Sequence, residues 1–265
     1  MRKFLLGVPL VLGVASSGLM AEKGGGFIGI NYQVGQGRMN TGLYTNNNYS
    51  PGMWHLNKQG VAVGNQNWQG TNISWHGKYA NGAMNGFGFL AGQSFFFKPL
   101  NAKTAWLGLR YYGFFDYGYA HLGRQLSVPT TVGGSIYNGS VDLSMVAYGV
   151  GTDLMGNFFD RENASVGVYG GFAIGGNAWQ VNRATLHAWE DALMASNTGS
   201  VGKPSHGNFN VWLNFGFRAN IHKHNGIELG VKIPMLVNKF LKTAGGQYYS
   251  LKRDYSVYLG YLYTF

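Results

Sequence analysis

The C-terminal segment 255–265, YSVYLGYLYTF, alternates between two kinds of side chain and finishes on an aromatic residue. Its odd-numbered positions are all aromatic or aliphatic, whereas Ser256, Gly260 and Thr264 lie between them. Successive side chains of a β-strand point to opposite faces, so this spacing puts a continuous apolar face on an extended strand. The segment therefore predicts a strand that turns one whole face toward an apolar environment.

This segment resembles the closing strand of a bacterial outer-membrane β-barrel. In such strands the insertion machinery recognises a terminal aromatic residue with further aromatics two and four positions before it. The resemblance implies that Tyr261, Tyr263 and Phe265 form the insertion signal and that the barrel-insertion machinery is a partner. A strand of a soluble β-sandwich is the alternative, and the N-terminal sequence argues against it because it indicates export.

The N-terminal segment 1–21 has the pattern of a secretory signal peptide. Arg2 and Lys3 precede an apolar run over 4–14, and small residues lead to Ala21, a plausible cleavage point. The apolar run is too short to cross a bilayer as a helix, which needs about 20 residues. We therefore expect a signal peptide over 1–21 and one β-barrel domain over 22–265, with the exact cleavage site left open by Leu19.

The composition favours a membrane barrel over a soluble domain. Charged residues make up 11% of the chain, whereas soluble domains usually carry about 25%. There is no cysteine, so neither a disulfide nor thiolate chemistry is expected. The formal net charge is +10, but the basic residues form no dense cluster, so we expect no nucleic-acid partner. Outer-membrane lipid and lipopolysaccharide are the partners that an exported basic chain of this kind would meet.

Alternating segments along the chain predict an all-β fold, an eight-stranded antiparallel transmembrane β-barrel in the outer membrane. Long connections (37–83, 120–139, 182–206, 235–247) alternate with short ones (98–103, 157–163, 222–225), which is the asymmetry between extracellular loops and periplasmic turns. A short helix is expected within 184–194. The predicted strands are 27–36, 84–97, 104–119, 140–156, 164–181, 207–221, 226–234 and 248–265.

The strand over 207–221 has aromatic and aliphatic residues at odd positions and mostly amides at even positions, which predicts lipid outside and a small polar lumen inside. Side chains that face each other across an antiparallel pair share one face, so the next turn must have an odd length and Arg218 must lie opposite or diagonal to Glu228. Asp142 and Asp153 have opposite parity, which predicts a bulge or a wrong boundary between them. The predicted lumen charges are Arg110, Asp116, Arg218, Glu228, Lys232 and Asp254.

These inward charges have two interpretations. They either line a selective passage or satisfy one another as a plug, and the plug is favoured because eight strands leave room for little more than side chains. In the first long connection, aromatic residues among Asn and Gly either form a recognition surface or pack on one another and the outer leaflet. These surface-contact candidates are Tyr44, Tyr49, Trp54, Trp68, Trp75 and Tyr79.

Six segments match a known family of membrane proteins: GGFIGINYQVGQ (25–36), LGLRYYGFFDYGYA (107–120), YGVGTDLMGNFF (148–159), NFGFRANI (214–221), NGIELGVKIP (225–234) and RDYSVYLGYLYTF (253–265). Together they resemble the Helicobacter outer membrane protein family, whose members share a C-terminal barrel. The resemblance implies an outer-membrane location and leaves host attachment and porin activity both open. No cysteines brace an extracellular head, so the carbohydrate-binding head of the large adhesins is not carried over.

The sequence offers little support for catalysis. His222 and His224 have no third metal ligand nearby, and adjacent Ser205 and His206 would point to opposite faces of a strand. We therefore expect no enzyme activity, no metal and no cofactor. The expected function is structural or host-surface contact through displayed loops, in the manner of an adhesin, with a host surface ligand as a further partner. A small-solute porin or channel is the alternative.

Overall fold

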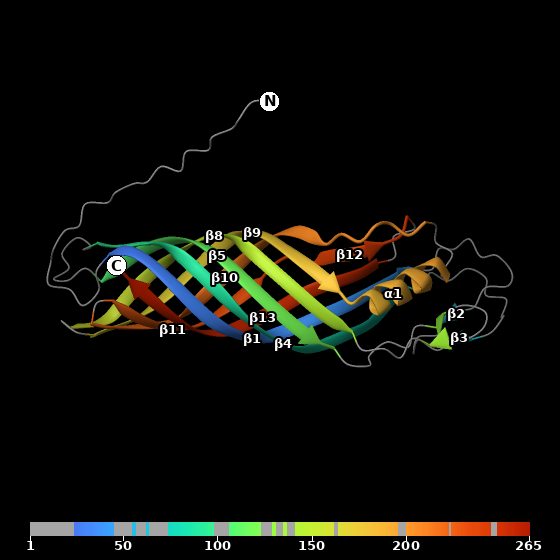
Figure 1. The fold of residues 1–265 in the computed structure, drawn as a ribbon, viewed down its shortest axis with the longest axis horizontal. Coiled ribbons are helices and arrows are strands. Elements are labelled where there is room, and N and C mark those ends of the chain that lie inside the picture. The colour runs from blue at the N-terminus through green and yellow to red at the C-terminus, as the bar shows by residue number, and fades with distance from the viewer. Residues whose placement is uncertain are drawn as a thin grey trace, which may run out of the picture.

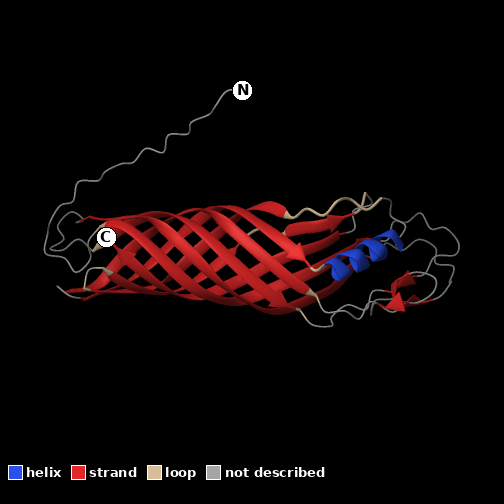
Figure 2. Ribbon diagram, in the orientation of Figure 1, coloured by secondary structure: helices blue, strands red, loops and turns tan. Residues whose placement is uncertain are grey.

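The computed structural model describes residues 24–44, 55–56, 62–63, 74–97, 106–122, 129–130, 135–136, 141–161, 164–195, 200–222, 224–244 and 248–265. They form a closed eight-stranded antiparallel β-barrel, as predicted (Figures 1 and 2). The expected signal peptide, 1–21, lies outside these residues. The barrel strands are β1 (Gly25–Tyr44), β4 (Ser74–Phe97), β5 (Leu107–His121), β8 (Asp142–Arg161), β9 (Ala164–Val181), β10 (Gly207–Ile221), β11 (Asn225–Pro234) and β13 (Tyr248–Thr264).

Each barrel strand pairs with its neighbours in the chain, and β1 closes the ring on β13 from Phe27↔Thr264 to Gly42↔Tyr248. The remaining elements lie between barrel strands. Because β12 pairs with the far part of β13, the connection predicted over 235–247 contains a strand. The additional elements are β2 (His55–Leu56), β3 (Ala62–Val63), β6 (Pro129–Thr130), β7 (Ser135–Ile136), α1 (Arg183–Ala195) and β12 (Asn238–Lys242).

Two predicted connections were too long. Residues 37–44 and 74–83, assigned to the first extracellular connection, continue β1 and β4 and pair with each other, as at Arg38↔Asn81. Likewise β8 runs on to Arg161, so the predicted turn over 157–163 shortens to 162–163. Polar and glycine residues at these strand ends hid the continuing alternation. The turn between β10 and β11 has the predicted odd length, since Ile221 pairs with Asn225.

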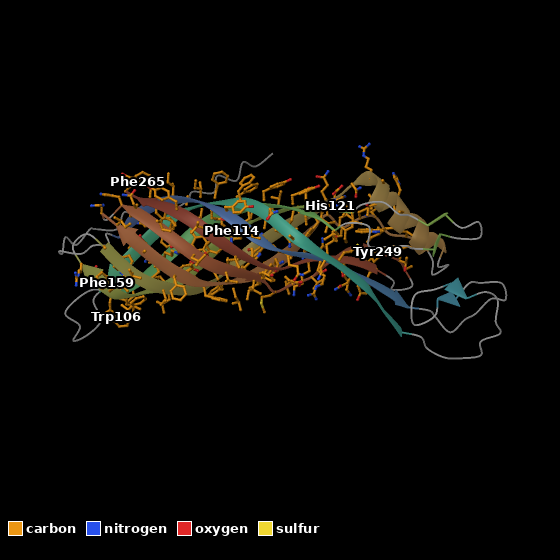
Figure 3. All side chains as sticks on the ribbon, turned by 90° about the horizontal axis from the view of Figure 1, so that it is seen from below. Trp106, Phe114, His121, Phe159, Tyr249 and Phe265 are labelled. Atoms are coloured by element: carbon orange, nitrogen blue, oxygen red, sulfur yellow. The ribbon has the colours of Figure 1, made fainter. Side chains whose placement is uncertain are left out.

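The outer face of the barrel is apolar, as the alternation predicted. Phe209, Phe217 and Leu259 are exposed, whereas their even-numbered neighbours on β10 and β13 mostly point inward and are buried. Aromatic side chains stand out from the wall along the barrel, including Trp106, Phe159 and Phe265 toward the end with the short turns (Figure 3). In a closed ring the backbone groups at both edges of each barrel strand are hydrogen-bonded to a neighbouring strand, so lipid can cover this surface.

The predicted irregularity between Asp142 and Asp153 is wrong. The register of β8 against β5 is continuous from His121↔Asp142 to Leu107↔Gly156. Asp153 faces inward and is buried, whereas Asp142 faces outward and contacts His121. The shift in β8 comes later, between Asn157 and Phe159 against β9. The strand is therefore regular between the two aspartates, and its alternation puts one on the outer face and the other in the lumen.

Helix α1 packs over the extracellular end of the barrel, beside the ends of β12 and β13 (Figures 1 and 2). The predicted helix over 184–194 is thus confirmed, with ends at Arg183 and Ala195. Trp189 stacks on Tyr249 of β13 with ring centroids 4.7 Å apart and meets Phe240 of β12 edge-on at 6.2 Å. Leu193 is fully buried in the same cluster. No helix in the described parts of the chain is long and apolar enough to span a bilayer.

Replacing Trp189 with alanine is expected to release α1 from the barrel end. The indole is buried and stacked, so its loss removes about 3 kcal/mol of local stability. Hydrogen exchange of the amides in 183–195 is then expected to become about 100-fold faster, while amides in the middle of β5 keep their rates. His187→Ala, at an exposed position of the same helix, is the matched control. Unchanged exchange in α1 would contradict the packing role of Trp189.

Candidate functional site: the ion-pair network in the lumen

Two ion pairs cross the barrel from one wall to the opposite wall. Arg110 and Asp116 point inward from β5, and Glu228 and Lys232 point inward from β11. In the ring, β8, β9 and β10 lie between β5 and β11 on one side, and β4, β1 and β13 on the other. Arg110 bonds to Glu228, and Lys232 Nζ lies 2.5 Å from Asp116 Oδ2. The lumen is therefore bridged across its diameter at two levels.

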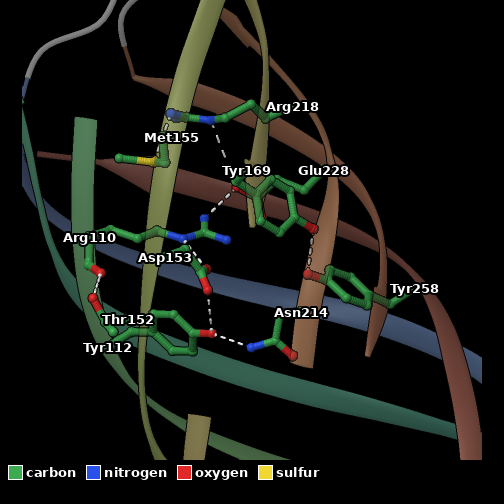
Figure 4. A network of polar contacts seen from close by, with 10 residues as sticks. All are labelled: Arg110, Tyr112, Thr152, Asp153, Met155, Tyr169, Asn214, Arg218, Glu228 and Tyr258. Carbon is green, nitrogen blue, oxygen red and sulfur yellow. Dashed lines mark hydrogen bonds and ion pairs between the residues drawn. The ribbon is translucent and has the colours of Figure 1, made fainter. Parts of the chain in front are cut away.

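The level nearer the short turns is centred on Arg110 (Figure 4). Its Nε donates to Asp153 Oδ2 at 2.7 Å, and its Nη1 donates to Glu228 Oε1. Arg218, directly opposite Glu228 in the β10–β11 register as predicted, has its Nε 4.0 Å from the same Oε1. One carboxylate thus faces two guanidinium groups, and Asp153 supplies the second negative charge beside Arg110.

Aromatic and amide side chains complete this level (Figure 4). The Tyr112 hydroxyl donates to Asp153 Oδ1 at 3.2 Å and accepts a bond from Asn214 Nδ2 at 2.7 Å. The hydroxyl groups of Tyr169 and Tyr258 bond to each other, and the Arg110 guanidinium lies 4.6 Å from the Tyr169 ring centroid. Bulky rings therefore occupy the space around the ion pairs.

The second level is centred on Asp116. Besides the contact with Lys232, its Oδ1 accepts a bond from Gln33 Nε2 at 2.6 Å, and the same Nε2 lies 2.7 Å from Asn31 Oδ1. The Lys232 ammonium lies 4.5 Å from the centroid of the Phe114 ring. Strands β1, β5 and β11 therefore meet here through polar side chains in the lumen.

The charges in the lumen nearly balance. The buried charged residues in the described part of the chain are the cations Arg110, Arg218, Lys232 and Arg253 and the carboxylates Asp116, Asp153 and Glu228. Each carboxylate contacts at least one cation. Charges taken out of water are tolerated when they are paired and hydrogen-bonded in this way. The arrangement is chemically suited to holding strands together across the lumen.

The structure places five of the predicted lumen charges in this network and one elsewhere. Asp254 lies where the β1–β13 register shifts, opposite the step from Gln36 to Gly37, and its carboxylate pairs with Arg38 at 2.7 Å. The same shift turns Arg253 inward, which the sequence reading missed. Asp153 was also left out of the predicted network, although it would have been included if the odd positions of β8 had been taken as inward.

The other predicted site residues are divided between described and undescribed parts of the chain. Tyr44 belongs to β1, and Trp75 and Tyr79 belong to β4, so these three lie on strands rather than in a loop. Tyr49, Trp54 and Trp68 lie outside the described residues. The terminal aromatics Tyr261, Tyr263 and Phe265 all face outward and are exposed.

The histidine and serine candidates contact the backbone instead of one another. His224 Nδ1 lies 2.6 Å from Thr264 O, and His206 Nδ1 lies 3.0 Å from Trp179 O. The Ser205 hydroxyl donates to Gly207 O at 3.4 Å. Within the described ranges, no group of three or more His, Cys, Asp or Glu residues is placed to hold a metal ion. These contacts give no assembled nucleophile and base among the side chains that the structure describes.

The family described as Helicobacter outer membrane protein matches this chain over residues 88–265, more than half of its length. No curated protein sequence matches it significantly. The chain is similar in structure to the outer membrane protein OprG from Pseudomonas aeruginosa, with 10% identity, a TM-score of 0.42, and coverage of 92% of this chain and 97% of that one. It is also similar to Ail, the attachment invasion locus protein of Yersinia pestis, with 13% identity, a TM-score of 0.31, and coverage of 90% and 98%. At these identities the likeness concerns the fold alone.

Proposed function

Because the chain belongs to the Helicobacter outer membrane protein family and is an outer-membrane β-barrel, we propose that it is a non-enzymatic barrel that displays its extracellular end for structural or host-surface contact. The observation that supports this proposal is the pair of ionic bridges between the opposite strands β5 and β11. A lumen occupied by paired charges and rings leaves little room for a solute. The part of the barrel left to meet other molecules is then its surface.

The extracellular end is built to present a surface. Strands β1 and β4 pair as far as Tyr44↔Ser74, beyond the point where β5 and β8 stop at His121↔Asp142. Helix α1 adds a second projection at this end, held by its stacked tryptophan. Rigid strands and a packed helix can hold contact residues in place at low entropic cost. A host surface ligand is the partner that this proposal requires, and no metal or cofactor takes part in it.

A small-solute channel is the competing function, and the charged lumen is the observation that favours it. The two functions differ in a direct measurement, the conductance of the purified full chain in a planar lipid bilayer. We expect no stepwise current from the folded protein, because both ionic bridges stay in place. Steps that change ion preference in Arg218→Glu protein would contradict the plug and establish a channel.

Surface contact needs its own measurement. Cells that display the full chain are expected to bind host cells or glycan-coated surfaces better than cells that display a variant with 45–73 replaced by a short glycine and serine linker. This replacement removes the segment between β1 and β4 and leaves both strands intact. Equal display of the two proteins, measured by surface labelling, is the control. Equal binding would contradict contact through this connection.

A further inference from the structure

Four basic side chains gather on the outer face of the barrel near its extracellular end. They are Arg38 of β1, Lys239 and Lys242 of β12, and Lys252 of β13, and we refer to them as the basic rim patch. Lys239 and Lys242 are exposed, and the other two are partly exposed. The neighbours of Arg38 and Lys252 along the strands are buried in the interior, so these two side chains point outward.

The strand registers bring three cations of this patch together, and they place Lys242 opposite Tyr248, four residues before Lys252 on β13. Arg38 is directly opposite Lys252 in the β1–β13 pairing, and Lys239 is opposite Ser250, two residues from Lys252 on β13. Lys239 is therefore a diagonal neighbour of Lys252. Like charges that face each other across a strand pair destabilise it. A bound anion would remove this cost.

The described residues provide only one counter-charge here. Asp254 pairs with Arg38 at 2.7 Å. No carboxylate in the described part of the chain forms an ion pair with Lys239, Lys242 or Lys252, and the Lys239 ammonium instead lies 5.1 Å from the Tyr248 ring centroid. The basic rim patch thus holds four cations against one carboxylate.

The patch borders the apolar outer surface. On β1, Tyr32 and Val34 are exposed on the outer face, and on β13, Tyr255 and Val257 continue the same surface. Arg38 lies four residues beyond Val34, about 13 Å along the strand. Lipid chains would cover the apolar residues, and the basic rim patch would then lie at the level of the head groups in the outer leaflet.

We propose that the basic rim patch binds the phosphate groups of an outer-leaflet lipid, whose acyl chains rest on the apolar surface formed by β1 and β13. Lysine ammonium groups bind phosphate as point charges, and basic side chains beside a membrane attract anionic head groups. The geometry places both parts of such a lipid on adjacent strands. This site is separate from the lumen and does not depend on the proposed surface-contact function.

The experiment measures binding of bis-phosphorylated lipid A to the folded full chain in neutral detergent micelles by native mass spectrometry. The variant carries Lys239→Gln, Lys242→Gln and Lys252→Gln together. We expect about 100-fold weaker binding, because each lysine near an anionic head group contributes about fivefold. Dephosphorylated lipid A is expected to bind the unmodified protein as weakly as lipid A binds the variant.

The matched control is Arg161→Gln, which neutralises an exposed cation at the end of β8 near the opposite rim. It is expected to bind lipid A within twofold of the unmodified protein. Heat-modifiable migration on gels shows that each variant is folded. Equal binding of lipid A by the triple variant would overturn the proposal, as would equal binding of dephosphorylated lipid A. Displacement of lipid A by inorganic phosphate at the same concentration would overturn it too, since the site would then hold a free ion.

Discussion

Replacing Glu228 with alanine is expected to lower the free energy of unfolding of the barrel by about 3–5 kcal/mol. Its carboxylate contacts Arg110 from across the lumen and lies near Arg218 on the neighbouring strand. Without it, Arg110 keeps its bond to Asp153 but loses its partner across the lumen, and Arg218 loses the carboxylate 4.0 Å from its Nε. An uncompensated buried charge costs more than the lost contact itself. The effect is large because a single residue joins opposite walls.

The measurement is urea unfolding of the protein in lipid vesicles, followed by heat-modifiable migration on gels. Glu190→Ala is the matched control, because Glu190 lies on α1 and its ion pair among the described residues is with an exposed histidine at 3.4 Å. It is expected to change the free energy of unfolding by less than about 0.5 kcal/mol. A loss below about 1 kcal/mol in Glu228→Ala would show that water or another side chain compensates the arginines.

A second variant distinguishes the effect of the unpaired charge from the effect of lost side-chain volume. Replacing Arg110 with methionine and Glu228 with leucine removes both charges of the bridge and keeps apolar volume in the lumen. Such replacements of buried ion pairs are often neutral or stabilising, although Asp153 then loses its bond from Arg110 and keeps the one from Tyr112. We expect the double variant to be more stable than Glu228→Ala. Equal instability of the two would contradict the unpaired charge of Arg110 as the cause of the loss.

Alternation in the sequence was enough to predict the barrel, because a period of two with an apolar face is a local property of each strand. The odd-length turn followed from the same rule, and with it the facing pair Arg218 and Glu228. The even or odd position of a residue in its strand also identified the inward charges on β5, where Arg110 and Asp116 both lie in the lumen. It cannot say which of them meet, because that depends on strands far apart in the chain.

The errors arise where parity is interrupted or weakly encoded. One register shift places Asp254 beside Arg38 and turns Arg253 inward, and no glycine or proline in 250–256 marks it. The far ends of β1 and β4 contain several glycine and polar residues, so their pairing is visible only once both strands are placed together. Long-range register, and not local preference, decides both features.

Replacing Phe265 with alanine is expected to reduce the amount of folded protein in the outer membrane at least tenfold, while the protein that does fold loses no more stability than a variant truncated elsewhere on the outer face of β13. The ring is 62% exposed and meets the Tyr263 ring edge-on at 5.4 Å, while the backbone amide bonds to Gly26 O at 2.9 Å. The ring has few contacts within the fold, and the contact with lipid that it loses is also lost when another outer-face residue of β13 is truncated. A large loss in cells must then come from poor recognition by the insertion machinery.

Two readouts distinguish recognition from stability. Folded protein in outer-membrane fractions is measured by heat-modifiable migration, and the free energy of unfolding is measured on protein refolded in vesicles. Leu259→Ala is the matched control, because Leu259 is 59% exposed on the same face of β13 and lies outside the terminal aromatic set. It is expected to assemble normally in cells. If Phe265→Ala protein assembles as well as the control, the exposed terminal ring serves only to contact lipid, since its contacts in the fold are too few to give it another role.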